Sequence, residues 1–306
     1  MYKAIISVIL FAAVLTGCGT DRPPGGGLLI SSNQTGNWEV FIFYPQSSMV
    51  HQVTHEGPWV PEDQASGAIV EGNDFEAAWS PDGKQIALVS DRSSQTKLYI
   101  VDTAGAEITE FAELSVGEPA WSPDGSQIAF RADLDGDVDL YLADVDGSNV
   151  RQLTRSPGED WTPAWSPDGT LLAFSSRRGN GTWDLFTMRP DGSEITQLTN
   201  DPWDNYLPDW SPDGTQIAFA GNRSGNWDIY TMGLDGNSVR QLSNHEKNDI
   251  EPVWSPDGTL LAFASARTTT VVGWEIFFVD VESGEVSGSG KAGYPTDWFS
   301  EIEDSG

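Results

Sequence analysis

Acidic and amide side chains recur at fixed distances ahead of a pentapeptide, Trp-Ser-Pro-Asp-Gly, that this chain repeats five times. The pentapeptides begin at Trp79, Trp121, Trp165, Trp210 and Trp254, and Trp298 follows in the same register. The residues five positions before these tryptophans are Asp74, Val116, Asp160, Asn205, Asp249 and Gly293. The residues three positions before them are Glu76, Glu118, Thr162, Leu207, Glu251 and Pro295. Oxygen atoms of this kind bind Ca²⁺ or Mg²⁺ rather than zinc, and they also accept hydrogen bonds from basic or donor groups of a peptide.

The spacing of the pentapeptides is typical of a β-propeller, in which the first strand of each blade is usually innermost. If the strand before each pentapeptide is that first strand, these positions form an oxygen-rich ring at one mouth of the central channel. The candidate ligand-binding residues are Asp74, Asp160, Asn205, Asp249, Glu118 and Glu251. An alternative stays open, in which these side chains cap turns and accept hydrogen bonds from backbone amides at strand starts. The binding hypothesis predicts that a double variant with Ala in place of both Asp160 and Asp249 binds its ligand more weakly but still folds.

Motifs for catalysis are scarce in this sequence. It has no Gly-x-Ser-x-Gly nucleophile turn and no His-Glu-x-x-His pair, and its three histidines are His51, His55 and His245. His51 and His55 lie around the end of a predicted strand, where their spacing does not place both side chains on one helical face. We therefore predict that the histidines lie on exposed loops and that there are no catalytic residues and no cofactor, and we leave open a Ca²⁺ or Mg²⁺ ion in the channel.

The repeat that carries these residues has the length of a β-propeller blade. Successive pentapeptides lie 42 to 45 residues apart, and propeller blades repeat at roughly 40–50 residues. Within the fourth repeat, Pro212-Asp213-Gly214 supplies a tight turn, because Pro presets φ and Gly adopts a positive φ. The runs 216–221 and 227–232 are rich in the aromatic and β-branched residues typical of strands. Each repeat therefore predicts a four-stranded antiparallel blade, and the chain is predicted to be all-β.

The two ends of the repeat region predict a sixth, composite blade. Residues 28–54 match the second to fourth strands of the repeat and have no pentapeptide before them. Residues 294–300 match a first strand that has nothing after it. Three N-terminal strands and one C-terminal strand therefore complete one blade, which removes the open sheet edge. We predict a six-bladed propeller over residues 28–300, followed by an acidic tail at 301–306.

Two further sets of residues are predicted to be structural. The motif tryptophans supply large apolar areas for the core, with a ring for sugar stacking as the alternative. Arginines recur at the end of the second strand, and acidic residues recur on the third. We expect ion pairs between them across the hairpin, for example Arg178 with Asp184. A longer connection, 55–73, is either a binding loop or a neutral insertion.

The N-terminus carries the pattern of an export signal. Lys3 precedes an apolar run that ends in Leu15-Thr16-Gly17-Cys18, and such a short run is a cleaved signal rather than a membrane span. The ending resembles the lipobox of bacterial lipoproteins, which implies cleavage after residue 17 and lipidation of Cys18, the sole cysteine. Residues 1–17 are thus the predicted signal peptide. Residues 18–27 are the lipidated Cys and a flexible Gly- and Pro-containing tether. We expect the chain in the bacterial cell envelope, anchored to a membrane outside the cytoplasm.

The chain is strongly acidic, with a formal net charge of −30. Such a charge argues against binding to nucleic acid or attraction to anionic lipid surfaces. Many of the carboxylates lie in Asp-Gly turns, so part of the charge follows from the fold itself. We expect a monomer that reaches the membrane through its lipid anchor.

With these motifs in view, the chain resembles the TolB-type six-bladed propellers. The resemblance rests on the pattern Pro-x-Trp-Ser-Pro-Asp-Gly-x-x-(Ile/Leu)-Ala-Phe, as in 208–219, and on Gly-Asn-Trp-Asp-Ile-Tyr in 225–230. It covers residues 28–300 and implies a propeller that binds a protein partner in the cell envelope. The α/β domain that precedes the propeller in TolB has no counterpart in this sequence.

The sequence therefore predicts a lipid-anchored binding module for a protein or peptide ligand at a channel mouth. One alternative is a carbohydrate lyase or hydrolase that uses channel carboxylates, which a close carboxylate pair with one raised pKa would favour. The other alternative is a purely structural envelope protein.

Overall fold

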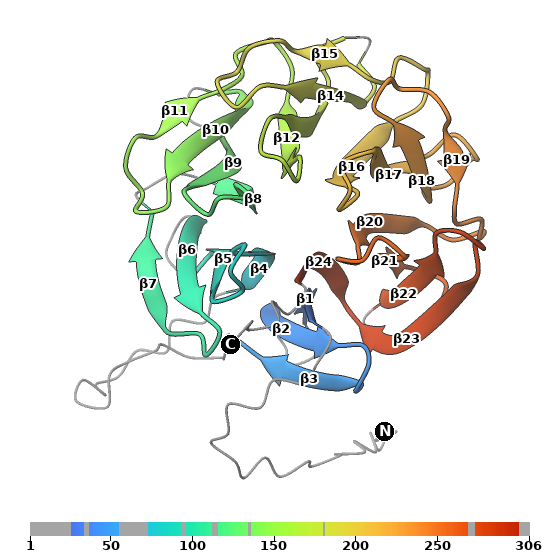
Figure 1. The fold of residues 1–306 in the computed structure, drawn as a ribbon, viewed down its shortest axis with the longest axis horizontal. Coiled ribbons are helices and arrows are strands. Elements are labelled where there is room, and N and C mark those ends of the chain that lie inside the picture. Colours follow the sequence, from blue (N-terminus) through green and yellow to red (C-terminus); the bar gives the residue numbers. More distant parts are fainter. Residues whose placement is uncertain are drawn as a thin grey trace, which may run out of the picture.

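The structure, a computed structural model, describes residues 26–33, 37–54, 73–92, 96–111, 116–133, 136–179, 181–268 and 273–299. Six four-stranded antiparallel sheets stand around a central axis like the blades of a propeller (Figure 1). The predicted all-β, six-bladed fold is therefore confirmed. Among the described residues there is no helix long and apolar enough to cross a membrane.

Each blade runs outward from a first strand at the axis to a fourth strand at the rim (Figure 1). The composite blade contains β24 (Tyr294–Phe299), β1 (Gly27–Ser32), β2 (Glu39–Tyr44) and β3 (Met49–Gln52). The second blade contains β4 (Asp74–Trp79), β5 (Gln85–Ser90), β6 (Lys97–Asp102) and β7 (Glu107–Glu110). The third contains β8 (Val116–Trp121), β9 (Gln127–Asp133), β10 (Val138–Asp144) and β11 (Arg151–Gln152).

The remaining three blades follow in chain order. The fourth contains β12 (Asp160–Trp165), β13 (Leu172–Ser176), β14 (Asp184–Met188) and β15 (Thr196–Gln197). The fifth contains β16 (Asn205–Trp210), β17 (Gln216–Gly221), β18 (Asp228–Gly233) and β19 (Arg240–Gln241). The sixth contains β20 (Asp249–Trp254), β21 (Leu260–Ser265), β22 (Glu275–Asp280) and β23 (Val286–Ala292).

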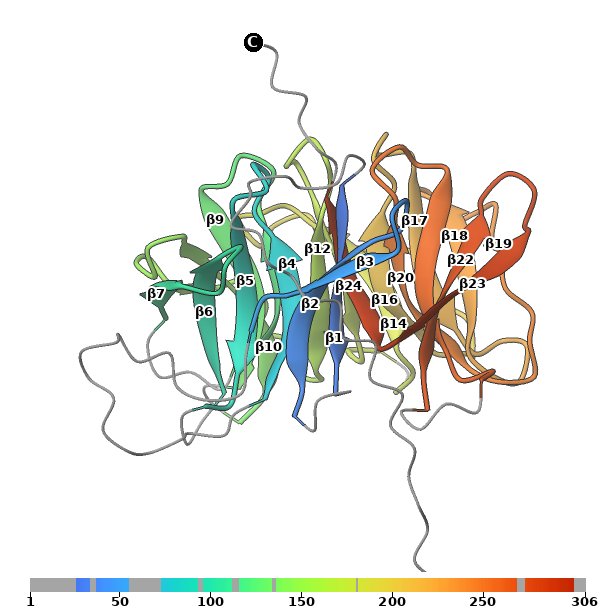
Figure 2. The same ribbon diagram turned by 90° about the horizontal axis from the view of Figure 1, so that it is seen from below.

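The chain ends close the ring as predicted. Strand β24 pairs antiparallel with β1, with Trp298 opposite Leu28 and Tyr294 opposite Ser31. It lies beside β1 between the neighbouring blades (Figures 1 and 2). The composite blade therefore leaves no unpaired first strand at the axis. Cys18 and the predicted signal peptide lie outside the described residues, as do 55–72 of the long connection and the tail 301–306.

The core lies between adjacent blades rather than in one central mass. In one cluster, Ala173 and Leu185 of the fourth blade pack against Trp210, Ile217 and Phe219 of the fifth. A buried side chain of this size contributes about 1.5–3 kcal/mol, so each blade interface adds several such contributions. The structural role predicted for the motif tryptophans is confirmed in four blades, because each indole N–H donates to a carbonyl oxygen of the preceding blade. These donors are Trp79, Trp121, Trp165 and Trp210, at 3.0–3.2 Å.

The pentapeptide forms the same turn in each repeat. In the fifth blade, Ser211 Oγ donates to Asp213 Oδ1 at 2.6 Å, and the same oxygen accepts from the Thr215 amide at 3.0 Å. Gly214 has a φ of +69°, and its amide donates to the Ser211 carbonyl at 2.8 Å. These bonds hold the pKa of Asp213 below its usual value, chiefly through the Ser211 hydroxyl. The motif acids are thus committed to turns.

The ion pairs predicted across the second hairpin were wrong. The second-strand arginines pair with the first strand instead: Arg178 Nη2 lies 2.9 Å from Asp160 and Arg267 Nη2 lies 2.6 Å from Asp249. The third-strand acids face the fourth strand and the residues just after it: Gln197 Nε2 donates to Asp184 Oδ2 at 3.2 Å, and Thr199 Oγ1 donates to Asp184 Oδ1 at 2.9 Å. Counting residue types along the hairpin could not distinguish these partners, because the pairing depends on which face of each strand the side chain occupies.

Candidate functional site

The first strands of five blades share a bulge that turns one side chain toward the axis. Three residues before the motif Trp, φ is positive, between 49° and 58°. The residues are Glu76, Glu118, Thr162, Leu207 and Glu251. Strand register shifts at the same points. A bulge of this kind redirects the chain and re-aims its side chains, and all five residues line a central cavity of about 340 Å³.

Two of the channel glutamates link neighbouring blades. Glu76 Oε2 accepts a hydrogen bond from the Glu118 amide at 2.8 Å, and Glu118 Oε2 accepts from the Thr162 amide at 2.6 Å. Each carboxylate therefore accepts a hydrogen bond from the backbone amide of the equivalent residue in the next blade. These bonds satisfy amides that the bulge leaves without strand partners.

A single arginine from the third blade serves both carboxylates. Arg131 Nη2 lies 3.6 Å from Glu76 Oε1, and Arg131 Nε lies 3.4 Å from Glu118 Oε2. The guanidinium also lies over the Trp161 ring, 4.3 Å from its centroid. Gly117 makes room for it, since a Cβ there would come within 2.5 Å of the guanidinium. The absence of one side chain thus admits the cation to the channel.

Burial dominates the electrostatics of the channel. It raises the pKa of Glu118 to about 8, with the charge of Glu76 adding to the effect and Arg131 opposing it. The pKa of Glu76 is also raised by burial, against the attraction of Arg131. Burial raises the pKa of Glu251 to about 8 as well, and the charges of Glu76 and Glu118 add to it. Three carboxyl groups therefore compete for too little compensating positive charge.

Two aspartates lie further along the same channel. Asp209 Oδ2 accepts from the Trp254 amide at 2.8 Å, and Asp297 Oδ2 accepts from the Trp79 amide at 2.7 Å. Burial raises the pKa of Asp209 to about 7 and that of Asp297 to about 6. Each aspartate bonds the first residue of a motif in the next blade, so both fasten blades together.

The mouth at which the first strands begin, here called the start mouth, is rimmed by aromatic rings. Residues before the third strands meet residues near the beginnings of the first strands: Trp183 lies 5.0 Å from Tyr206, and Trp274 lies 5.4 Å from Tyr294, centroid to centroid. A second cavity, of about 300 Å³, opens here. It is lined by Glu118, Tyr206, Leu207, Trp227, Asn248, Ile250, Glu251 and Trp274.

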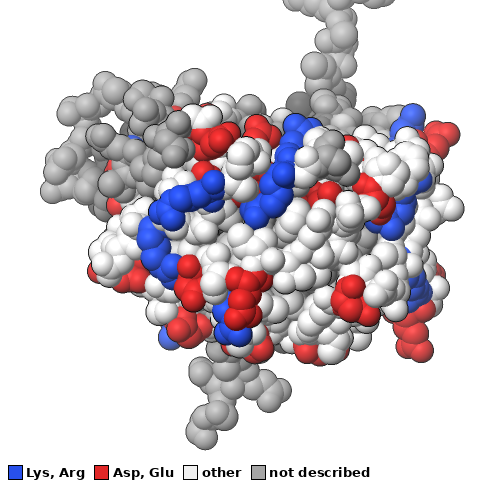
Figure 3. All heavy atoms as spheres, turned by 90° about the horizontal axis from the view of Figure 1, so that it is seen from above, with Lys and Arg blue, Asp and Glu red and all other residues white. Residues whose placement is uncertain are grey.

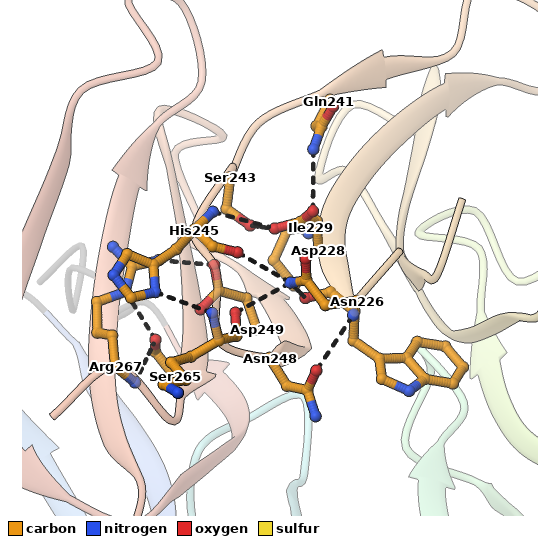
Figure 4. A network of polar contacts seen from close by, with 12 residues as sticks. Asn226, Asp228, Ile229, Gln241, Ser243, His245, Asn248, Asp249, Ser265 and Arg267 are labelled. Carbon is orange, nitrogen blue, oxygen red and sulfur yellow. Dashed lines mark hydrogen bonds and ion pairs between the residues drawn. The ribbon is translucent and has the colours of Figure 1, made fainter. Parts of the chain in front are cut away.

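The predicted site residues divide into two groups. Glu118 and Glu251 line the central cavity and the mouth cavity. Asp74, Asp160, Asn205 and Asp249 are buried and bind arginines of their own blades. In the sixth blade, Asp249 belongs to a polar network with Arg267, Ser265 and Ser243 (Figure 4). The same network fixes the rim, because Asn248 Oδ1 accepts from the Trp227 amide at 3.3 Å. The structure thus brings the glutamates together at the axis and places the other four inside the blades.

Other predicted features have simple placements. His51 lies exposed on β3, not in a loop, within 3.3 Å of the Thr103 carbonyl oxygen. His245 Nδ1 accepts a hydrogen bond from the Lys247 amide within the loop that contains both residues. His55 lies outside the described residues. Within the described ranges, no group of three or more His, Cys, Asp or Glu side chains is arranged to hold a metal ion. One outer wall of the molecule carries acidic and basic side chains interspersed with uncharged ones (Figure 3).

Sequence reasoning missed Arg131 and the aromatic rim. Both leave a trace in the repeat: Arg131 occupies the position held by Ser175, Ala220 and Ala264 in the following blades. Gly117 stands where those blades have Trp161, Tyr206 and Ile250. An alignment of the repeats would therefore show that the third blade has a large residue, Arg131, where the following blades have a small one, and a small residue, Gly117, where they have a large one.

The geometry can be compared with known proteins. The family model described as TolB beta propeller domain matches residues 107–206 and 198–296, which together make up more than half of the chain. The chain belongs to the TolB β-propeller domain family. No curated protein matches this TolB-type propeller in sequence.

Solved structures resemble this TolB-type propeller in fold. A putative TolB from Agrobacterium tumefaciens is 23% identical with a TM-score of 0.68, over 90% of this chain and 92% of the other. TolB from Acinetobacter baumannii is 21% identical with a TM-score of 0.73, over 91% and 67%. An oligogalacturonate lyase from Vibrio parahaemolyticus is 13% identical with a TM-score of 0.58, over 86% and 74%. At these identities the likeness extends to the fold alone.

Proposed function

We propose that this protein is a lipid-anchored binding module of the bacterial cell envelope that receives a protein or peptide segment at the start mouth. The observation that carries the proposal is the cavity of about 300 Å³ at this mouth, where aromatic rings surround the carboxyls of Glu118 and Glu251. Aromatic anchors beside a few polar groups are typical of recognition sites. The lipobox-like ending at Cys18 supports the anchor and the extracytoplasmic location.

The rim is built to keep its shape before a ligand arrives. Trp227 is held through its amide by Asn248, and the Asn226 side chain donates to the carbonyls of His245 and Lys247 at 2.9 and 3.1 Å (Figure 4). A rim held in place loses little conformational freedom on binding, which favours affinity. The propeller supplies the rigid scaffold and the loops supply the contacts.

The test is crosslinking capture of the lipidated protein from its native membrane. We expect a specific partner with the wild type and its loss with Trp227→Ala/Trp274→Ala. The control is Leu234→Ala, which removes an exposed side chain (41%) in the turn after β18, away from the mouth. Capture by the double variant at the wild-type level would show that the mouth is not the binding face.

A carbohydrate-active enzyme is the second candidate, and one observation favours it. Glu76 and Glu118 share Arg131, and the pKa of Glu118 is raised to about 8, so one carboxyl holds a proton beside another acid. General acid catalysis uses such a group. Turnover of an envelope glycan by the wild type, abolished in Glu118→Gln, would support this candidate. Its absence across a panel of glycans leaves the binding module.

A further inference from the structure

One carboxyl in the channel lacks the partner that its counterparts have. Glu76 and Glu118 each accept the amide of the corresponding residue in the next blade. For Glu251 that residue is Pro295, which has no N–H to donate. The Oε2 atom of Glu251 is buried and has no hydrogen-bond partner among the described residues. A buried acceptor of this kind is costly to leave unsatisfied, so a ligand that supplies a donor gains affinity there.

Nearby cations do not fill this gap. Arg131 pairs with Glu76 and Glu118, and no described Lys or Arg forms an ion pair with Glu251. The charges of Glu76 and Glu118 act on Glu251 from across the channel. A cationic donor therefore supplies both the missing hydrogen bond and the compensating charge that lets Glu251 release its proton.

The space in front of Glu251 has the shape and lining for such a group. Glu251 lines the mouth cavity together with Trp227, Trp274 and Ile250, so a carboxyl lies at the inner end of an aromatic opening. Aromatic faces attract cations and also pack against the methylene groups that carry them. A single oxygen without a donor suits an ammonium ion better than the two-pronged guanidinium of arginine.

We infer that Glu251 receives a primary ammonium group of the ligand, from a lysine side chain or an amino terminus, which enters the start mouth between Trp227 and Trp274. The inference rests on the proposed function, because it names the chemical group that the binding module recognises. Glu251 is a ligand-binding residue in this assignment, and the tryptophans position the carbon chain that carries the ammonium.

Calorimetric titration with small probes tests the inference on the full chain. The probes are N-acetyl-lysine amide for the side-chain source, alanyl-alanine amide for the amino-terminal source, and N-acetyl-norleucine amide as the uncharged control. We expect one of the two amines to bind at least tenfold more tightly than the norleucine compound. We expect Glu251→Gln to abolish that preference, while Glu246→Gln, which changes an exposed glutamate (side chain 81% exposed), retains it.

The outcomes separate this inference from the proposed function. Equal binding of the amine and norleucine probes, or an unchanged preference in Glu251→Gln, overturns the ammonium assignment. So does the absence of amine binding at millimolar concentration. In each case, partner capture that still depends on Trp227 and Trp274 leaves the proposed function standing. Loss of that dependence overturns the proposed function itself.

Discussion

Replacing Glu251 with Gln should change how the stability of the propeller depends on pH. The pKa of Glu251 rises from 4.5 to about 8 in the folded chain, mainly through burial. Between these values the carboxyl holds a proton in the folded state and has lost it in the unfolded state. The folded state therefore binds more protons, and the free energy of unfolding falls as the pH rises.

The size of the effect follows from the same linkage. One proton difference changes the free energy of unfolding by about 1.4 kcal/mol per pH unit, so Glu251 contributes a loss of roughly 3 kcal/mol between pH 5 and 7. Glutamine has the same shape and no charge, so Glu251→Gln removes this contribution. Glu118 also has a raised pKa and is present in both proteins, so the difference between them reports the loss of the Glu251 carboxyl together with its electrostatic effect on Glu76 and Glu118.

Urea denaturation at pH 5, 6 and 7 measures the difference. We expect the stability of Glu251→Gln relative to wild type to rise over this range, by up to about 3 kcal/mol. Glu246→Gln should follow the wild type because its side chain is exposed (81%). Parallel curves for wild type and Glu251→Gln would refute the claim that this carboxyl is buried without compensation.

Three further predictions concern the framework around the channel. Asp160→Ala should lower the free energy of unfolding by about 3–5 kcal/mol, because it removes the buried carboxylate that pairs with the Arg178 guanidinium. A loss below about 1 kcal/mol in chemical denaturation would contradict this prediction. Folding should therefore suffer in the Asp160→Ala/Asp249→Ala variant that the sequence predicted to be neutral. Trp121→Phe should lower the free energy of unfolding by about 1 kcal/mol more than Trp254→Phe does. The Trp121 indole donates to the Ala78 carbonyl, whereas the Trp254 indole has no partner among the described residues. Equal losses in chemical denaturation would contradict this prediction. Gly117→Ala should displace the Arg131 guanidinium and reduce the melting temperature measurably. The exposed Gly179→Ala, where a Cβ meets nothing within 4 Å, should leave it unchanged; a wild-type melting temperature for Gly117→Ala would mean that Arg131 moves freely.

The fold was predictable from the sequence because its signals are local and repeated. Each Trp-Ser-Pro-Asp-Gly turn forms within one short segment, and the spacing of its copies counts the blades. The composite blade followed from partial repeats at the two ends, and β24 pairs with β1 accordingly. These features need no knowledge of long-range side-chain contacts.

The site was only partly predictable because it depends on the bulge. A regular alternation from Asp249 to Glu251 suggests that both side chains face the same way. Glu251 has a φ of +55°, which is uncommon for a glutamate and cannot be predicted from the residue type. The alternation of side chains along the strand therefore breaks at this residue. Asp249 turns into its blade toward Arg267, and Glu251 turns to the channel. Glu118 lines the channel, and its partner Arg131 depends on the space left by Gly117.

Site-specific photocrosslinking in the native membrane tests the central claim most directly. A photoreactive aromatic amino acid, which keeps a ring at the start mouth, replaces Trp227 in one variant and Leu234 outside the mouth in the other. The binding proposal predicts a crosslinked peptide from position 227 alone, with a lysine or an amino terminus next to the attachment point. Equal crosslinking from both positions, or products from position 234 alone, would contradict it.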